Sequence, residues 1–326
     1  MNLARRQFLQ LAGTAATTLV LMQDARALDY PVRPVRMVVP YAPGGVTDVV
    51  ARLIAQQLSQ RLDRQFYIEN LTGGSGNMGT AQAARAAPDG YTILVTFSSF
   101  VVNPTLFDKL PFDPIKDFEP ITLAVSSTTV LVVNPSLPVR NVKELVAFVK
   151  ANPGKHNFAS AGTGTQSHLA GEQFRLSLGL DLVHVPFSGG APSVASVIAG
   201  HTPIGFTSPT AAAPQIKDGK VRALAVTSHT RSQTLPDVET MTEAGFPDIK
   251  GDNWVGLLFP AGTPKELVNL LNHEIVAILA LPDMRERLAT LGNDPVASTP
   301  EEFTQQIKNE IQMWGDVIRR ANIKPQ

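Results

Sequence analysis

Cysteine is absent from all 326 residues, which excludes several kinds of chemistry. Disulfide scaffolds, thiol nucleophiles and metal sites built on thiolates all need cysteine. An excess of one charge is also lacking, because 28 lysine and arginine residues balance 28 aspartate and glutamate residues. A protein that follows nucleic-acid phosphates needs a basic face, so we expect no nucleic-acid partner.

Long apolar runs are missing after the N-terminal segment, and aromatic residues make up only 6% of the chain. A membrane-spanning helix needs about 18 or more consecutive apolar residues, so none is expected after residue 27. The low aromatic content disfavours a cage for a large aromatic ligand. Hydrophobic residues nevertheless reach 44%, which predicts a globular protein of about two domains.

Residues 1–27 have the three-part pattern of an export signal. Arg5 and Arg6 give a basic start, residues 11–22 are small and apolar, and residues 25–27 form an A-x-A-like cleavage site. The paired arginines resemble a twin-arginine signal. This pattern predicts a periplasmic protein cleaved after about Ala27, with an amphipathic N-terminal helix as the alternative.

Short β-prone runs alternate with helical patterns through the rest of the chain, which is typical of α/β domains with largely parallel sheets. Two helices are expected at 48–62 and 142–151, and a last one begins after the cap Thr299. Strands are expected at 36–40, 65–69, 92–96, 130–134, 157–161, 182–186, 204–207, 223–227 and 254–260.

Two segments, 123–134 and 246–254, have the composition of crossings between domains. They predict one lobe made of residues 28–127 plus 250–326, with a second lobe, 128–249, inserted between these parts. A double connection of this kind forms a hinge that lets two lobes close around a ligand.

The first candidate binding segment joins a buried strand to a helix through two glycines. A helix N-terminus has free N–H groups and a dipole that favours an anion, and glycine lets a ligand approach the backbone. The alternative is an ordinary turn in which Asp48 caps the helix. The candidate ligand-binding residues here are Tyr41, Ala42, Gly44, Gly45, Thr47 and Asp48.

A second strand–helix loop, at 160–168, also leads into a helix N-terminus that favours an anion, and it has more hydroxyl groups. It has no P-loop lysine, which disfavours a nucleoside triphosphate. His168 either contacts a ligand or caps and packs the helix start. The candidate ligand-binding residues in this loop are Ala161, Gly162, Thr163, Gly164, Thr165, Ser167 and His168.

Gly74, Gly76 and Gly79 fit the spacing of a dinucleotide-binding motif. The acidic ribose partner about 20 residues later is missing, so a glycine-lined wall or a simple helix entry is favoured. We therefore expect no cofactor.

Catalytic and metal-binding motifs are absent: there is no G-x-S-x-G elbow and no H-E-x-x-H, and the six histidines stand singly. No catalytic residue and no metal is expected. A Ser–His–Asp triad assembled in space would make the protein an exported hydrolase of a carboxylated substrate, which stays open as the alternative.

Several segments together resemble the Bug-type solute-binding proteins, the periplasmic receptors of tripartite tricarboxylate transporters. They are PYAPGGVTDVVAR (40–52), GGSGNMGTAQAARAAPDGYT (73–92), VPFSGGAPSVASVIAGHTPIGF (185–206), KVRALAVTSHTRSQTLPDVETMTEAGFPD (220–248) and LLFPAGTPKELVNLLN (257–272). The resemblance follows the order of the family and covers nearly all of the chain after residue 27.

The resemblance implies a two-lobed Venus-flytrap of the type II periplasmic-binding-protein class, each lobe a mostly parallel sheet flanked by helices. A carboxylate would lie between the lobes, held by the first loop through main-chain amides and water and by the second loop from the other lobe. Membrane components of a transporter, or a membrane sensor in signalling, would be the partners of a monomeric receptor.

Specificity is implied for Thr207 and Ser208, which stand where many relatives place an acidic residue after the phenylalanine. An acid there meets an amino group, so its absence indicates a simple carboxylate. Ser98, after the strand at 92–96, completes the candidate binding residues.

Overall fold

The computed structural model describes residues 29–228 and 230–324. The chain divides into two units, Met1–Arg33 and Pro34–Gln326. Within the first unit only residues 29–33 are described, and their Tyr30–Pro31 peptide is cis. The predicted export signal, residues 1–27, lies outside the described residues.

Residues 34–326 contain a six-stranded sheet with the order β11-β4-β10-β3-β1-β2. Strand β1 runs parallel to β2 and β3, whereas β10 runs antiparallel to both β3 and β4. Its strands are β1 (Val35–Val39), β2 (Phe66–Asn70), β3 (Thr92–Phe97), β4 (Phe118–Ser127), β10 (Asn253–Pro260) and β11 (Asp294–Pro295).

A second sheet has five strands in the order β7-β6-β8-β5-β9. Strand β6 is parallel to β7 and β8, and β5 is antiparallel to β8 and β9. The strands are β5 (Val130–Val133), β6 (His156–Ser160), β7 (Leu182–Pro186), β8 (Ile204–Thr207) and β9 (Arg222–Val226).

The expectation of mostly parallel sheets needs correction, because both sheets are mixed. Each expected strand is present with its ends within one residue of those expected, but the first half of β4 was missed. The chain passes from β4 to β5 and from β9 to β10 without an intervening helix. Strands that enter a sheet by such direct links do not need the parallel βαβ crossover.

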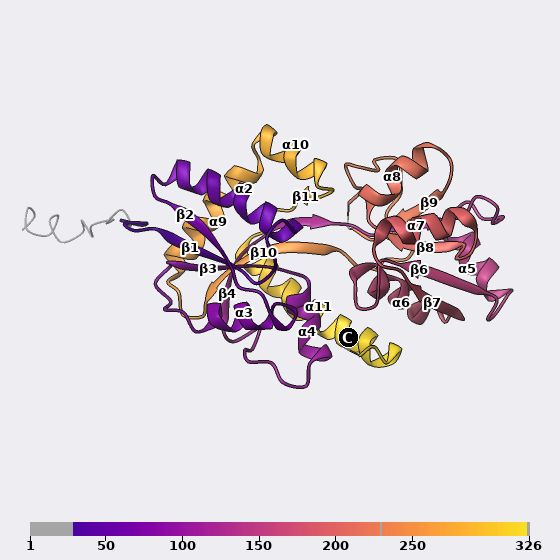
Figure 1. Ribbon diagram of the computed structural model, residues 1–326, viewed down its shortest axis with the longest axis horizontal. Helices are drawn as coiled ribbons and strands as arrows, with labels where there is room; N and C mark the ends of the chain where they lie inside the picture. Colours follow the sequence, from indigo (N-terminus) through magenta and orange to yellow (C-terminus); the bar gives the residue numbers. More distant parts are fainter. Residues whose placement is uncertain (1–28, 229, 325–326) are drawn as a thin grey trace, which may run out of the picture. The chain divides into compact units, whose positions relative to one another are not determined.

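Helices cover both faces of each sheet (Figure 1). On the six-stranded sheet, α2 and α9 pack on one face and α3, α4 and α11 on the other. The helices of this part are α2 (Val46–Arg61), the short 3-10 helix η1 (Gly74–Gly76), α3 (Asn77–Ala84), α4 (Ser99–Leu106), α9 (Lys265–Leu279), α10 (Pro282–Thr290) and α11 (Pro300–Ala321).

The five-stranded sheet carries α5 and α6 on one face and α7 and α8 on the other. These helices are α5 (Val142–Lys150), α6 (Gln166–Leu178), α7 (Gly190–Ala199) and α8 (Pro209–Lys217). Phe158, Phe174 and Phe206 are fully buried and form the centre of the core under α6.

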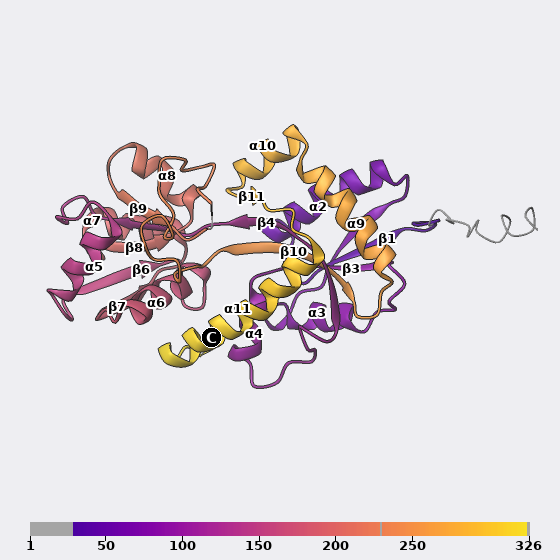
Figure 2. The ribbon, with the colours of Figure 1, turned by 180° about the vertical axis from the view of Figure 1, so that it is seen from behind.

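Helix α11 contacts elements of both sheets, namely α4 and β4 on one side and α6 on the other (Figure 2). Its buried face carries Phe303, Ile307 and Trp314, which join the core of the six-stranded sheet. Among the described helices, no single one has the length and apolar character to cross a membrane, and α9 with α10 meets that test only as a pair bent by 77°.

Candidate ligand-binding site

The loop between β1 and α2 presents an open helix N-terminus. Gly44 has a φ of +85°, a conformation that favours glycine, and its N–H donates to Asp48 Oδ2 at 2.9 Å. Within the described chain, the N–H groups of Val46 and Thr47 have no acceptor. Such groups at the positive end of a helix dipole are suited to an anion.

Asp48 supports this loop from inside. Its carboxylate, with the side chain 3% exposed, accepts hydrogen bonds from Arg52 Nε at 2.9 Å, Arg52 Nη2 at 3.0 Å and Asn70 Nδ2 at 2.9 Å, besides that from Gly44. Burial acts to raise the pKa of Asp48, but these donors outweigh it and hold the pKa below its usual value. Both oxygens accept hydrogen bonds within the chain, so Asp48 positions the loop.

Tyr41 lies under the same loop with its hydroxyl buried. The hydroxyl is 2.9 Å from Thr96 Oγ1 and 2.8 Å from Ser99 Oγ, and burial raises the pKa of Tyr41 despite these bonds. A Cβ on Gly76 would lie 2.7 Å from Tyr41 Cε1. The glycine-rich segment therefore packs against Tyr41. This close packing within the protein explains why residue 76 is a glycine.

The loop between β6 and α6 uses most of its hydroxyls internally. Thr165 caps α6, and its Oγ1 also donates to the Gly162 carbonyl at 2.7 Å. Ser167 Oγ accepts the N–H of Ala161 at 3.0 Å. Gly162 and Gly164 have φ values of +136° and +78°, so the turn depends on glycine at both positions.

Three N–H groups of this second loop have no acceptor in the described part of the chain. They belong to Thr163, Gln166 and Ser167, at the N-terminus of α6. The amide nitrogen of the Gln166 side chain is likewise buried without a partner. The loop therefore offers several donors and a helix dipole to an anion.

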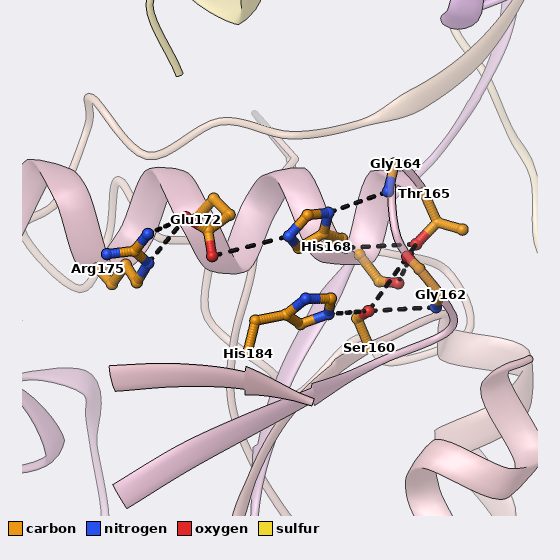
Figure 3. Close-up of polar contacts among 9 residues, drawn as sticks. Ser160, Gly162, Gly164, Thr165, His168, Glu172, Arg175 and His184 are labelled. Carbon is orange, nitrogen blue, oxygen red and sulfur yellow. Dashed lines mark hydrogen bonds and ion pairs between the residues drawn. The ribbon is translucent and has the colours of Figure 1, made fainter. Parts of the chain in front are cut away.

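Two stacked histidines, the buried His168 and the half-buried His184, lie beside the second loop (Figure 3). His168 Nδ1 accepts the N–H of Gly164 at 3.0 Å, and its Nε2 lies 3.7 Å from Glu172 Oε1. Arg175 Nε donates to Glu172 at 2.8 Å. Burial acts to raise the pKa of Glu172, but hydrogen bonds from His168 and Arg175 outweigh it and lower that pKa.

The second histidine, His184, stacks on His168 with ring centres 3.8 Å apart. Burial, and then the nearby His168, lower the pKa of His184 to about 4, so it is neutral at pH 7. Its Nε2 is 2.7 Å from Ser160 Oγ. This serine–histidine contact does not make a nucleophile, because Ser160 is fully buried and no substrate reaches it.

A cavity of about 450 Å³ lies between the second loop and α4. Of the predicted binding residues, Ser98, Thr163, Gly164 and Thr165 line it, while Tyr41 bonds to the lining residue Ser99. Ser98 Oγ also donates to Asn253 Oδ1 at 2.6 Å. The other predicted residues of the first loop, including Ala42, Gly45 and Thr47, do not line this cavity.

Thr207 and Ser208 lie beside the N-terminus of α7. Thr207 is 1% exposed and its Oγ1 has no partner, while Ser208 caps α8. A Cβ on Gly190 would lie 3.3 Å from Thr207 Oγ1, so glycine avoids a tight contact with this buried hydroxyl. The structure thus places Thr207 as a free donor and Ser208 as a helix cap.

Sequence reasoning missed several lining residues, among them Gln166, Asn253 and Lys324. Gln166 is the first residue of α6, so its position in a helix start was a usable signal. Asn253 begins β10, and Lys324 follows α11 far along the chain. Only the fold brings these two to the cavity, so no local pattern could have found them.

Comparison with known proteins agrees with this architecture. Residues 50–323 match the model of the tripartite tricarboxylate transporter family receptor, TctC. The chain is 34% identical to Protein BugT of Bordetella pertussis over 326 residues, covering 99% of each chain. Its likeness to periplasmic binding proteins of known structure confirms the predicted type II periplasmic-binding-protein fold.

Two solved structures of Rhodopseudomonas palustris proteins are similar over most of this chain. One is R. palustris Rpa4515 with adipate, at 31% identity and a TM-score of 0.69, covering 91% of this chain and 100% of the other. The second is MatC with bound malate, at 34% identity and a TM-score of 0.64, covering 89% and 100%. The matched family consists of solute-binding receptors, so the alternative of an exported hydrolase is not supported. The chain belongs to the TctC family of tripartite tricarboxylate transporter receptors and is a periplasmic solute-binding protein.

Proposed function

We propose that this receptor is exported, is cleaved after about Ala27, and binds a small organic carboxylate between lobes 28–127 plus 250–326 and 128–249. The open N-terminus of α6 carries this proposal, because three free N–H groups gather there beside a cavity. A carboxylate accepts hydrogen bonds in just this arrangement. The bound form is then recognised by the membrane components of a tripartite tricarboxylate transporter, and the receptor acts as a monomer.

The charges around the cavity favour a ligand that is an anion and carries no cationic group. Lys324 is the cation among the residues that line the cavity, and the described lining includes no aspartate or glutamate. Asp48 lies in the first loop, but its charge is compensated by Arg52. An amino-acid ligand would leave its ammonium group without a carboxylate partner, so a simple acid is favoured.

The ligand class is a short carboxylic acid with an apolar or hydroxylated chain. Phe97, Val102 and Leu106 offer apolar surface in the cavity, and Asn103 and Asn253 offer amides. Relatives with adipate and with malate have been solved, which supports testing dicarboxylates first. Charge-assisted hydrogen bonds contribute roughly 1.5–3 kcal/mol each, so two or three of them supply a large part of the binding free energy, and burial of the ligand's apolar surface adds to it.

We expect a thermal-shift screen of the purified protein against mono-, di- and tricarboxylates and amino acids to give stabilisation with one class of acid. A ligand at 100 times its Kd adds about 2.7 kcal/mol to stability, and the acid is recovered unchanged. Mass spectrometry of the denatured protein finds any acid that co-purified. The carboxylate proposal is abandoned if no acid shifts the midpoint and none co-purifies.

The variant Gly45→Val tests the first loop, with calorimetry for binding and the thermal midpoint for stability. Gly45 has φ −72° and ψ 164°, and the nearest atom to an added Cβ is 3.7 Å away, so the fold accepts valine. The added side chain covers the free amides of α2, and we expect weaker binding by calorimetry with an unchanged midpoint in the absence of ligand. Binding equal to that of the parent would remove this loop from the site.

A further inference from the structure

The direction of the free amides in the second loop depends on the Gly164 peptide. Gly164 has a positive φ and lies one residue before the cap of α6. Its own N–H turns inward to His168 Nδ1, while Thr163 and Gln166 on either side keep theirs free. If the inward bond were lost, the turn would no longer be fixed in the form that presents these donors.

Both ring nitrogens of His168 are committed within the protein. Nδ1 accepts from Gly164, and Nε2 faces the carboxylate of Glu172, as Figure 3 shows. The side chain is only 5% exposed, so the imidazole does not reach a ligand itself. These contacts require one protonation form, with hydrogen on Nε2 and a free lone pair on Nδ1.

We propose that His168 is a positioning residue for the carboxylate site, which holds the Gly164 peptide through a neutral Nδ1 and so aims the free amides of α6 at the ligand. This inference rests on the proposed function and assigns His168 a role other than ligand contact. Protonation of Nδ1 would set two donors against each other across 3.0 Å and release the turn.

The charged groups around the imidazole are few. Glu172 and Arg175 of α6 lie on its Nε2 side, and His184 of β7 stacks on the ring. Strand β6 contributes Ser160, and β8 brings no titratable residue. On the α11 side, Arg320 bonds to the Leu176 carbonyl, about two helical turns away. Loss of the acceptor at Nδ1 of His168 is therefore the change most directly coupled to the loop.

Three variants separate this role from packing. His168→Asn keeps an acceptor near the Nδ1 position without a titratable ring, whereas His168→Leu removes the acceptor and keeps bulk. His156→Asn, at the start of β6, is the matched control outside the cluster. Kd is measured by calorimetry from pH 6 to 8 with adipate and malate as probes, and each variant is compared with the parent at the same pH so that ligand ionisation cancels.

We expect His168→Leu to raise Kd about tenfold, the value of one hydrogen bond, and His168→Asn to stay near the parent at pH 8. His156→Asn is expected to bind like the parent at every pH. The proposal is overturned if His168→Leu binds normally, or if His168→Asn is as weak as His168→Leu.

Nitrogen NMR of labelled histidines gives a readout that needs no ligand. We expect the Nε2–H form of His168 at pH 8, and faster exchange of the Gly164 amide in His168→Leu. A hydrogen on Nδ1 would contradict the inference whatever the ligand is. If these signals are as expected but neither probe binds the parent, the dicarboxylate choice is wrong and the positioning role stands.

Discussion

Gly79 lies where three parts of the chain meet, and its missing side chain is a packing requirement. An added Cβ would lie 2.4 Å from the Leu71 carbonyl oxygen and 2.9 Å from Pro40 Cβ. Alanine normally stabilises a helix by about 1 kcal/mol relative to glycine, but forced overlap costs about 1–3 kcal/mol. We expect Gly79→Ala to lower the free energy of unfolding by up to about 2 kcal/mol in urea.

Gly315→Ala provides the control for Gly79→Ala, because this glycine also lies inside a helix. Its added Cβ meets Thr105 Oγ1 at 3.1 Å and the flexible end of Arg319 at 3.2 Å. Arg319 can move aside, so we expect a neutral or slightly stabilising effect. An equal loss in both variants would show that the contacts of Gly79 with Leu71 and Pro40 carry no special cost.

The positions of both candidate loops could be predicted from the sequence, but the hydrogen-bond partner of each polar atom could not. Strand ends, glycines and helix starts are local features, and the loops lie where they were expected. The hydroxyls of Thr165 and Ser167 are taken by the Gly162 carbonyl and the Ala161 amide. Which donors remain free depends on such internal pairing, and that is decided only by the folded turn.

At the scale of elements, α11 illustrates how a helix start is fixed by a few atoms. Thr299 Oγ1 accepts the N–H of Glu302 at 3.1 Å, and Glu302 Oε2 accepts the N–H of Thr299 at 2.9 Å. Removing this capping box by Thr299→Ala costs about 0.5–2 kcal/mol. Because α11 packs on both α4 and α6, we expect this loss in the global free energy of unfolding measured by chemical denaturation.

Thr290→Ala serves as the matched control for the cap. Thr290 is the last residue of α10, and its hydroxyl only returns to the Glu286 carbonyl of the same helix. A change within about 0.5 kcal/mol is expected there, as for other exposed positions. If both threonines gave the same small effect, the helix start would not limit stability.

Strand positions could be predicted because β-prone runs are local, whereas strand direction could not. β10 pairs with β3 and β4, which come more than 120 residues earlier in the chain. Alternation of strands and helices suggested parallel pairing, but the strands that follow the direct links, β5 and β10, each pair antiparallel with two neighbours. The expected boundaries of the two lobes stay a prediction.

On the scale of the whole molecule, a hydrogen-bond network of two buried threonines and a half-buried aspartate ties together the two connections between the sheets. Thr227 Oγ1 at the end of β9 donates to Asp252 Oδ1 at 3.1 Å and lies 3.2 Å from Thr128 Oγ1. Burial raises the pKa of Asp252 to about 7, and the nearby Glu310 adds to the increase. This carboxyl group therefore takes up a proton near neutral pH.

A raised pKa means that the folded protein binds this proton more tightly than the unfolded chain. The stabilising contribution of protonated Asp252 to the free energy of unfolding is complete below the pKa that Asp252 has in the unfolded chain, about 4. This contribution is lost as the pH rises to the pKa in the folded protein, about 7. We therefore expect the free energy of unfolding to fall between pH 5 and pH 8. One proton limits the slope to about 1.4 kcal/mol per pH unit, and the observed slope should be smaller because Asp252 borders a cavity.

Asp252→Asn keeps the size of the side chain and removes its charge. In this variant we expect a smaller loss of stability between pH 5 and pH 8 than in the parent, measured by urea denaturation at each pH. Asp294 and Glu310 also have raised pKa values and remain in both proteins. A decline as steep as that of the parent would assign the effect to those groups.

The position of β10 between β3 and β4 has a consequence for the order of synthesis. All strands of the five-stranded sheet lie within residues 130–226, so a ribosome completes that sheet before residue 253 has been made. Until β10 arrives, β3 and β4 have no partner at the edges that it later covers, and open strand edges invite pairing with other chains. A nascent chain that stalls before residue 260 is therefore the form of this protein most exposed to aggregation, although half of the molecule can already be complete.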